Sequence, residues 1–184
     1  KVFFRKFFEQ CSTLMQSIIK LPQPVIAQIH GTAAAAGCQL VATCDLAIAS
    51  TTAKFATPGV NIGLFCSTPM VAVSRKLPRK KMMEMLLMGE LVEAETALEF
   101  GLINRVVPYE QLEKTVSNYA NKIKEKSPLV LKIGKEAFYN QIDMPLADAY
   151  KYTAEVMTQN MLVQDAIEGI NAFIEKRAPT WTGK

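Results

Sequence analysis

The sequence predicts an α/β fold, because short apolar strands alternate with helical segments along its first two thirds. Residues 25–29 form an apolar run between Pro24 and Gly31, which is typical of a buried strand. A helical pattern follows within a few residues, and strands and helices then alternate as far as Pro108. From residue 110 onward the pattern is helical alone, so we expect the C-terminal third to contain helices only.

The individual elements follow from periodicity and from the prolines and glycines between them. Residues 2–19 place large apolar side chains at helical spacing, which predicts an opening helix that needs a partner surface. The expected strands are residues 25–29, 46–49, 54–56 and 104–107. The expected helices are residues 38–43, 70–75, 79–88 and 93–100, and Gly89 and Gly101 end the last two.

Prolines divide the helical C-terminal third. Pro128 and Pro145 each begin a helix, since proline is favoured in a first helical turn. Apolar side chains three and four residues apart form one stripe in residues 146–157 and another in residues 163–174. Such stripes must be buried against another surface. We therefore expect a core region at residues 1–126 and a separate helical region at residues 127–184.

The composition limits the class of protein. The chain has 184 residues, 49% of them apolar and 21% charged, which suits one globular domain with or without an appendage. Its net charge of +4 is spread out, so we expect no nucleic-acid partner. No apolar run reaches the ~20 residues of a membrane span.

The four cysteines lack metal-ligand spacing, so we expect reduced thiols, no metal and an intracellular location. We expect His30, the only histidine, in the core at a strand end.

Residues 33–37 are nearly without side chains and lead into a helix start. The first N–H groups of a helix have no partner within it, so this turn is suited to hold negative charge. Around a thioester oxygen, two such groups would form an oxyanion hole, in which one donor is worth about 10²–10³ in rate. Close packing of a helix on a sheet explains the same small residues equally well.

The segment PVIAQIHGTAAAAGCQLVATCDLAIAS, followed by FATPGVNIG, resembles the crotonase, or enoyl-CoA hydratase/isomerase, superfamily. The later segments MEMLLMGELVEAETALEFGLINRVVP and GINAFIEKRAP match the same family in the same order. The resemblance implies a crotonase-like spiral of ββα units, and a helical oligomerisation region at residues 127–184 that builds a homotrimer or hexamer. It also implies an acyl-CoA thioester as the ligand, with coenzyme A as part of the substrate and no separate cofactor. The backbone N–H groups of Ala36 and Gly37 fall where relatives hold the thioester oxygen.

Two residues depart from the family's pattern. Hydratases of this family exchange protons through two glutamates, whose positions are taken here by Gln39 and Gly59. Glutamine does not take up a proton near neutral pH, and glycine has no side chain. Because a positioned acid or base contributes about 10²–10⁴ in rate, we expect weak or absent hydratase activity. Gln39 is expected either to orient an acyl chain or a water or to be a satisfied polar residue, and Gly59 to shape the turn or widen the cavity.

Three further residues are expected near the ligand. Cys66 and Ser67 take the place where hydratases line the pocket; a thiol beside a helix start could also act as a nucleophile, and small-residue packing is the alternative. The resemblance implies that Lys176 approaches the coenzyme A phosphates, although a solvated helix end explains this lysine as well.

Three functions remain open from the sequence. The chain is a lyase or isomerase of the hydratase type, a non-catalytic acyl-CoA-binding or assembly protein, or an enzyme of different enolate chemistry: isomerisation, decarboxylation or thioester hydrolysis. The resemblance also implies that about a third of the family's usual length precedes Lys1 and supplies the second oxyanion N–H. We expect a mitochondrial location for a eukaryotic protein and a cytoplasmic one for a bacterial protein.

Overall fold

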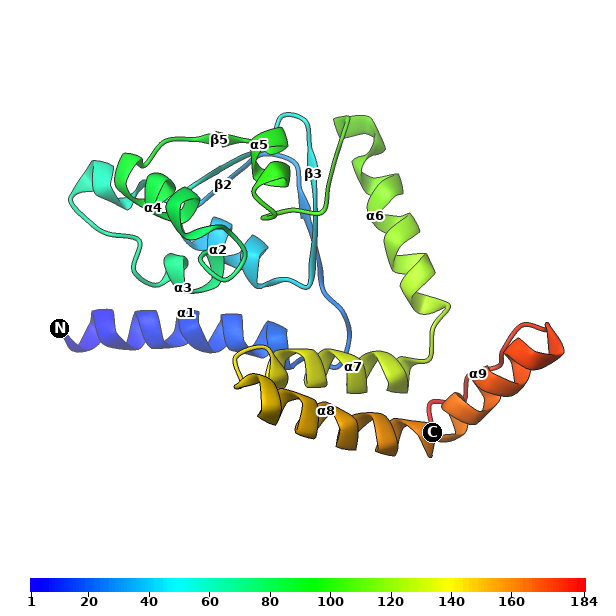
Figure 1. Cartoon of the computed structure of the whole chain (residues 1–184). Helices are drawn as coiled ribbons and strands as arrows, with labels where there is room; N and C mark the ends of the chain where they lie inside the picture. Colours follow the sequence, from blue (N-terminus) through cyan, green and yellow to red (C-terminus); the bar gives the residue numbers. More distant parts are fainter. The chain divides into compact units, whose positions relative to one another are not determined.

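The computed structural model describes residues 1–184, and the chain forms two compact units (Figure 1). Unit 1 consists of Lys1–Ile19 and Val25–Tyr119, and unit 2 of Lys20–Pro24 and Ala120–Lys184. All strands lie in unit 1, in parallel and mixed sheets interleaved with helices, which confirms the predicted α/β class. The boundary expected at residue 126 stays a prediction.

The elements alternate along unit 1 as the sequence pattern indicates. In chain order they are α1 (Val2–Lys20), β1 (Ile26–Ile29), β2 (Thr32–Ala34), α2 (Ala36–Thr43), β3 (Leu46–Ser50), β4 (Lys54–Ala56), the 3₁₀ helix η1 (Pro58–Ile62), α3 (Pro69–Val73), α4 (Arg79–Met88), β5 (Val92–Glu93), α5 (Ala94–Glu99) and β6 (Arg105–Val107). Gly89 and Gly101 follow α4 and α5 with positive φ angles of 63° and 82°, so both end their helices as the sequence predicted.

Six strands form two three-stranded sheets, one in the order β1-β3-β6 and the other in the order β2-β4-β5. The pairs in the first sheet are parallel, as is β2 with β4, whereas β4 and β5 are antiparallel. The first four strands alternate between the two sheets. Each pass of the chain therefore adds a strand to both sheets, and this places the end of β2 beside the end of β4.

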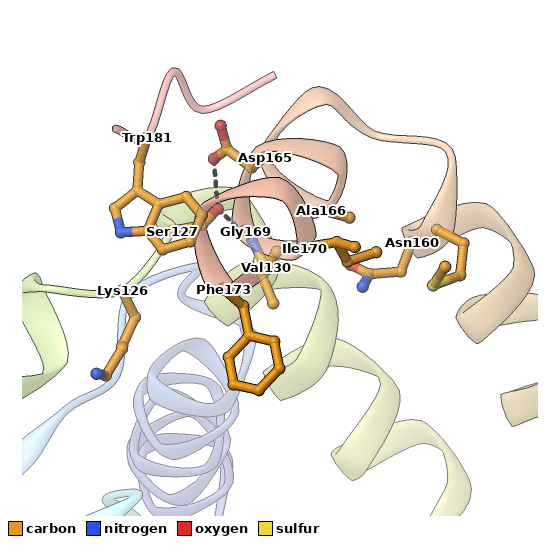
Figure 2. A pocket seen from close by; sticks show the side chains of 11 residues that line it. Lys126, Ser127, Val130, Asn160, Asp165, Ala166, Gly169, Ile170, Phe173 and Trp181 are labelled. Carbon is orange, nitrogen blue, oxygen red and sulfur yellow. Dashed lines mark hydrogen bonds between the residues drawn. The ribbon is translucent and has the colours of Figure 1, made fainter. Parts of the chain in front are cut away.

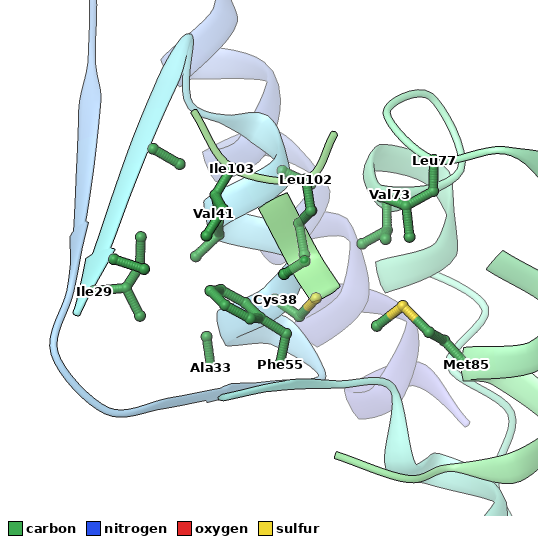
Figure 3. Packing of buried hydrophobic residues seen from close by; sticks show 14 of the residues in the cluster. Ile29, Ala33, Cys38, Val41, Phe55, Val73, Leu77, Met85, Leu102 and Ile103 are labelled. Atoms are coloured by element: carbon green, nitrogen blue, oxygen red, sulfur yellow. The ribbon is translucent and has the colours of Figure 1, made fainter. Parts of the chain in front are cut away.

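The main core lies between these sheets and helices α2 to α5 (Figure 3). Alternation along β3 sends Ala47 and Ala49 into this core, and Ile48 into a second cluster with Val107 and Leu112. Leu112 belongs to α6 (Tyr109–Lys124). The two faces of β3 are thus covered by different elements, and the small alanines allow close packing on the face that carries α2.

Two strands differ from the expectation. The sequence pattern predicts neither β2 nor β5, because alanine and glutamate are poor strand formers and the segments are short. Both form because β4 pairs with them: Ala33 pairs with Phe55, and Val92 with the same phenylalanine on its other side.

On α1, only Met15 and Ile18 are buried, while Phe3 is 71% exposed.

Unit 2 contains the end of α6, then α7 (Pro128–Gln141), α8 (Leu146–Met161) and α9 (Gln164–Glu175). Helices α7 and α8 lie side by side (Figure 1). At the start of α7, the Ser127 hydroxyl accepts a hydrogen bond from the N–H of Val130 at 3.1 Å. It also donates to Asp165 Oδ2 at 2.5 Å. None of the helices in the chain combines the length and apolar character needed to cross a membrane.

Candidate functional site

The small-residue turn connects β2 to α2 through an unusual backbone conformation. Ala35 has φ 49° and ψ −111°, and such positive φ values are uncommon for a residue with a Cβ atom. Its N–H donates to the carbonyl oxygen of Ala56 at the end of β4, at 3.0 Å. This bond continues the pairing of β2 and β4 by one step, and it holds the turn where α2 begins.

The first turn of α2 presents three N–H groups without an acceptor in the chain. The first bond of the helix runs from Gln39 N–H to Ala35 O at 3.0 Å, so the N–H groups of Ala36, Gly37 and Cys38 have no partner. Ala36 is exposed and Gly37 is half-buried. These adjacent donors at a helix start suit a developing negative charge, which is the arrangement that the sequence predicts.

Gln39 is buried at the end of this first turn. Only 4% of the residue is exposed, and its side-chain amide makes no hydrogen bond within the chain. Its carbonyl oxygen accepts from the Thr43 hydroxyl at 2.7 Å. The amide is therefore a neutral donor and acceptor without a protein partner, and the two expected roles of Gln39, orienting an acyl chain or a water and being a satisfied polar residue, both stay predictions.

Gly59 lies in η1, and the space beside it is already filled. A Cβ atom at this position would lie 3.0 Å from Cys66 Sγ and 3.0 Å from the carbonyl oxygen of Leu64. Its N–H donates to Cys66 Sγ at 3.3 Å. The expectation that Gly59 widens the cavity is wrong, because the 64–66 segment packs directly against the glycine.

The structure brings Cys66 to Gly59 but leaves Ser67 outside the buried site. Cys66 is 7% exposed, whereas Ser67 is exposed and its hydroxyl donates to Phe65 O at 3.3 Å. Burial raises the pKa of the nearby Cys38 thiol to about 12, with a smaller contribution from Cys66, so Cys38 stays protonated near neutral pH. His30 is exposed, and the expectation of a core histidine is wrong.

Lys176 lies in unit 2, just after α9, and is exposed. It caps the helix with a left-handed backbone at φ 54°. Its neighbour Arg177 forms a two-pronged ion pair with Glu168, at 2.7 and 2.9 Å. The hydrogen bonds from Arg177 lower the pKa of the Glu168 carboxyl to about 2. Arg177 is therefore engaged within unit 2, which leaves Lys176 as the basic side chain of this segment without an ion pair.

Unit 2 also contains a cavity that the sequence does not predict (Figure 2). It has a volume of about 450 Å³, and α9 contributes Ile170 and Phe173 to its lining. Asn160 Oδ1 is buried in this region without a hydrogen-bond partner. Phe173 is 86% exposed, so the cavity is open at this residue. The only sequence signal for it is the apolar stripe in residues 163–174.

Sequence reasoning also missed Thr57, the residue between β4 and η1. Thr57 is completely buried, and its hydroxyl has no hydrogen-bond partner. A buried hydroxyl normally has one, so this side chain is an exception that needs an explanation. No sequence pattern marks it, because only the fold decides that this position is enclosed.

Comparison with known proteins identifies the class. Residues 4–184 match the family model described as enoyl-CoA hydratase/isomerase. The chain belongs to this family, as the motifs predicted. Its fold is confirmed as crotonase-like by an enoyl-CoA hydratase structure from Mycobacterium smegmatis, which has a TM-score of 0.97 and 46% identity and covers 98% of this chain and 70% of that one.

One branch of the family is especially similar. The mitochondrial enoyl-CoA hydratase domain-containing protein 3 of Xenopus laevis is 50% identical over 99% of this chain and 62% of its own length. The crystal structure of the human protein of that name has a TM-score of 0.95 and 47% identity, covering 97% of this chain and 71% of that one. The chain thus spans less than two thirds of the frog relative's length. Residues 31–50 and 55–69 predict similarity to this branch of the family, and the 50% identity confirms that prediction.

Proposed function

We propose that this protein binds an acyl-CoA thioester and polarises its carbonyl oxygen with the backbone N–H groups of Ala36 and Gly37. The observation that carries this proposal is the set of adjacent N–H groups at the start of α2 that have no acceptor in the chain. The partial positive charge at a helix start stabilises negative charge on an oxygen held there. Family membership supports the thioester as the group that supplies this oxygen.

Ordinary hydration is not the reaction that this site favours. Adding water across a conjugated thioester requires a base for the water and an acid for the carbon, and neither Gln39 nor Gly59 transfers protons. A side chain at position 59 would require the 64–66 segment to shift, because an added Cβ would lie 3.0 Å from Leu64 O and from Cys66 Sγ. The missing carboxylates favour a non-catalytic acyl-CoA-binding or assembly protein as the second candidate. A different enolate reaction, such as isomerisation, decarboxylation or thioester hydrolysis, needs a proton carrier outside these two positions.

The remaining parts of the proposal concern the ligand's distal end and the assembly. Cys66 would lie near the acyl group, Ser67 at its exposed edge, and Lys176 would approach the coenzyme A phosphates, with no separate cofactor.

Unit 2 is proposed to hold a homotrimer or hexamer, because α9 exposes Ile174 at 70% and Phe173 at 86%. The frog relative is named mitochondrial, which supports that location if this protein is eukaryotic.

Calorimetric titration with butyryl-CoA tests the site. Replacing Gly37 by proline removes one N–H and disfavours the helical conformation of Ala36, so we expect the affinity to fall about tenfold or more. Gly37→Ala is the matched control, because it keeps the N–H and its Cβ would lie 3.9 Å from the nearest atom, Ala33 Cβ. Unchanged affinity in a folded Gly37→Pro protein would place the ligand elsewhere.

Hydration of crotonyl-CoA tests the chemistry. We expect a rate at least about 10²-fold below that of a family member with both glutamates, because one missing acid or base alone has that effect. A rate within about tenfold of that relative would contradict the proposal. Butyryl-CoA binding without turnover on any acyl-CoA of a panel would favour the non-catalytic candidate.

Light scattering tests the assembly. We expect a trimer or hexamer, and the variant Ile170→Asp should dissociate it by placing an unpaired charge in a buried interface. Lys132→Asp on α7 is the control variant. It also changes a charge on an exposed residue of unit 2, but it removes no apolar side chain, so we expect the assembly to persist. A stable monomer of the unmodified protein at micromolar concentration would refute the assembly.

A further inference from the structure

The cavity of unit 2 contains a buried polar atom that no group of the chain satisfies. Asn160, near the end of α8, lines this cavity, and its Oδ1 atom is buried without a hydrogen-bond partner. Leaving a buried acceptor unpaired is costly, and native proteins do so at few positions. A hydrogen-bond donor that enters the cavity can supply the missing partner.

The rest of the cavity wall is largely apolar. One face of α9, the start of α7 and the end of α8 form it, and its apolar residues include Val130, Ile170, Phe173 and Trp181 (Figure 2). Its volume of about 450 Å³ is about three times that of a ~150 Å³ apolar cavity that holds one benzene molecule. Ligand pockets of proteins measure about 300–1,000 Å³ and combine such walls with a few polar groups. The cavity therefore has the size and the lining of a small-molecule site.

Trp181 is held in the cavity wall from two sides. Its indole N–H donates to the carbonyl oxygen of Glu125, just after α6, at 2.7 Å. Its ring packs so closely on α9 that a Cβ atom at Gly169 would lie 3.2 Å from it. These contacts fix the wall before any ligand arrives, and a preformed cavity binds with a smaller loss of entropy.

The two ionisable residues of the lining do not serve the place beside Asn160. The Asp165 carboxylate already accepts hydrogen bonds from the Ser127 hydroxyl at 2.5 Å and from Thr182 N–H at 2.7 Å. Lys126 is exposed, and Figure 2 shows it on the opposite side of the cavity from Asn160. A charged group buried beside Asn160 would lack a counter-ion. The part of a ligand that meets Asn160 is therefore neutral.

The chemistry of an unpaired acceptor limits this neutral group further. An ether oxygen cannot donate a hydrogen bond, and an amine is charged near neutral pH. An amide N–H would bring a carbonyl oxygen that the apolar wall leaves unpaired. A hydroxyl donates through a single polar atom, so it fits both the acceptor and the wall.

We propose that the cavity of unit 2 binds a neutral, largely apolar molecule with one hydroxyl group, such as a medium-chain alcohol, whose hydroxyl donates to Asn160 Oδ1. Every residue of this site belongs to unit 2, whereas the N–H groups proposed for the thioester belong to unit 1. The inference therefore goes beyond the proposed acyl-CoA binding and does not depend on it.

The fluorescence of Trp181 tests the inference, because this residue lines the cavity and is the only tryptophan. Titration compares 1-decanol with 1-methoxynonane, an ether that has the same number of non-hydrogen atoms, and with decanoate, each below the concentration at which it aggregates. We expect a saturable signal at one alcohol per chain. The alcohol should bind about fivefold or more tightly than the ether, which leaves the acceptor unpaired. Decanoate, which is ionised at neutral pH, should bind more weakly than the alcohol.

Asn160→Leu should reduce the ratio of alcohol to ether affinity to about one, since leucine has a similar size and no acceptor. Asn140→Leu is the matched control, because Asn140 is also an asparagine of unit 2 but bonds the Tyr152 hydroxyl and does not line the cavity. We expect this control to keep the ratio. If Asn160→Leu does not fold, Ala166→Leu gives a second measurement, because the added side chain fills the cavity and should abolish binding of both ligands.

Four results would overturn the inference. The first is absence of 1-decanol binding to the folded protein, whether water or a second copy of the chain occupies the cavity. The second is a signal that does not saturate, which would mean partition onto exposed apolar surface. The third is an equal affinity for alcohol and ether, or a ratio that Asn160→Leu retains. The fourth is displacement of 1-decanol by butyryl-CoA, which would make the cavity part of the acyl-CoA site. Acyl-CoA binding itself is measured separately, so the proposed function stands or falls on its own titration.

Discussion

The packing around Gly59 predicts that even the smallest side chain there destabilises the fold. In Gly59→Ala, the new Cβ would lie 3.0 Å from Cys66 Sγ, 3.0 Å from Leu64 O and 3.3 Å from Cys66 N. Two of these atoms belong to the backbone, so the 64–66 segment has to move. Overpacking of this kind costs about 1–3 kcal/mol. Replacing glycine also restricts the unfolded chain, which stabilises by about 0.4–1 kcal/mol. We expect the destabilisation by overpacking to exceed the stabilisation from the restricted unfolded chain. The free energy of unfolding should therefore fall by about 0.5–2 kcal/mol.

Urea denaturation of four variants and the unmodified protein measures this effect. Gly31→Ala is the control within unit 1, because a Cβ at Gly31 meets no atom within 4 Å and should give only the unfolded-state gain. Cys66→Ala removes one of the close contacts. The double variant of Gly59→Ala and Cys66→Ala should therefore be more stable than the sum of the single effects by about 0.5–1 kcal/mol.

A Gly59→Ala protein as stable as the Gly31→Ala control would refute this reasoning. If the crowding is real, the same physics predicts that Gly59→Glu alone does not restore hydration of crotonyl-CoA. The glutamate side chain would have to displace the segment that fills its position. Packing as well as residue identity therefore disfavours a carboxylate at position 59.

Two further predictions concern ionisable groups. The hydrogen bond from Ser127 lowers the pKa of Asp165 from 3.8, and those from Arg177 lower that of Glu168 from 4.5 to about 2. Because both carboxyls are stabilised as anions in the folded state, their contribution is present above the ordinary pKa and is lost as pH falls from about 4.5 toward 2 and below. The fluorescence of Trp181 should therefore show that unit 2 loses stability in this pH range. Asp165→Asn should lower the stability of unit 2 already at pH 7. A fluorescence signal that does not change with pH would contradict this prediction. Iodoacetamide at pH 8 should modify Cys11 well before Cys38, whose buried thiol has a pKa of about 12, and equal rates by mass spectrometry would contradict that burial.

The sequence by itself determined the α/β class, most helix ends and the place of the small-residue turn at residues 33–37. These features depend on local chemistry: glycines adopt the left-handed conformation that ends α4 and α5, and residues 33–37 are too small to cover the N–H groups of a helix start. The substitution of both catalytic glutamates was also readable, because Gln39 and Gly59 are fixed by motif position alone.

Only the tertiary structure decided which groups surround that turn. Strand β2 exists because β4 pairs with it, although its two alanines are poor strand formers. Thr57 has an unpartnered hydroxyl because pairing and burial enclose it, and Cys66 fills the space beside Gly59 because the chain returns there seven residues later. Each of these features depends on contacts between segments that are far apart in the sequence. The spacing of residue types along the chain does not determine which of these segments come into contact.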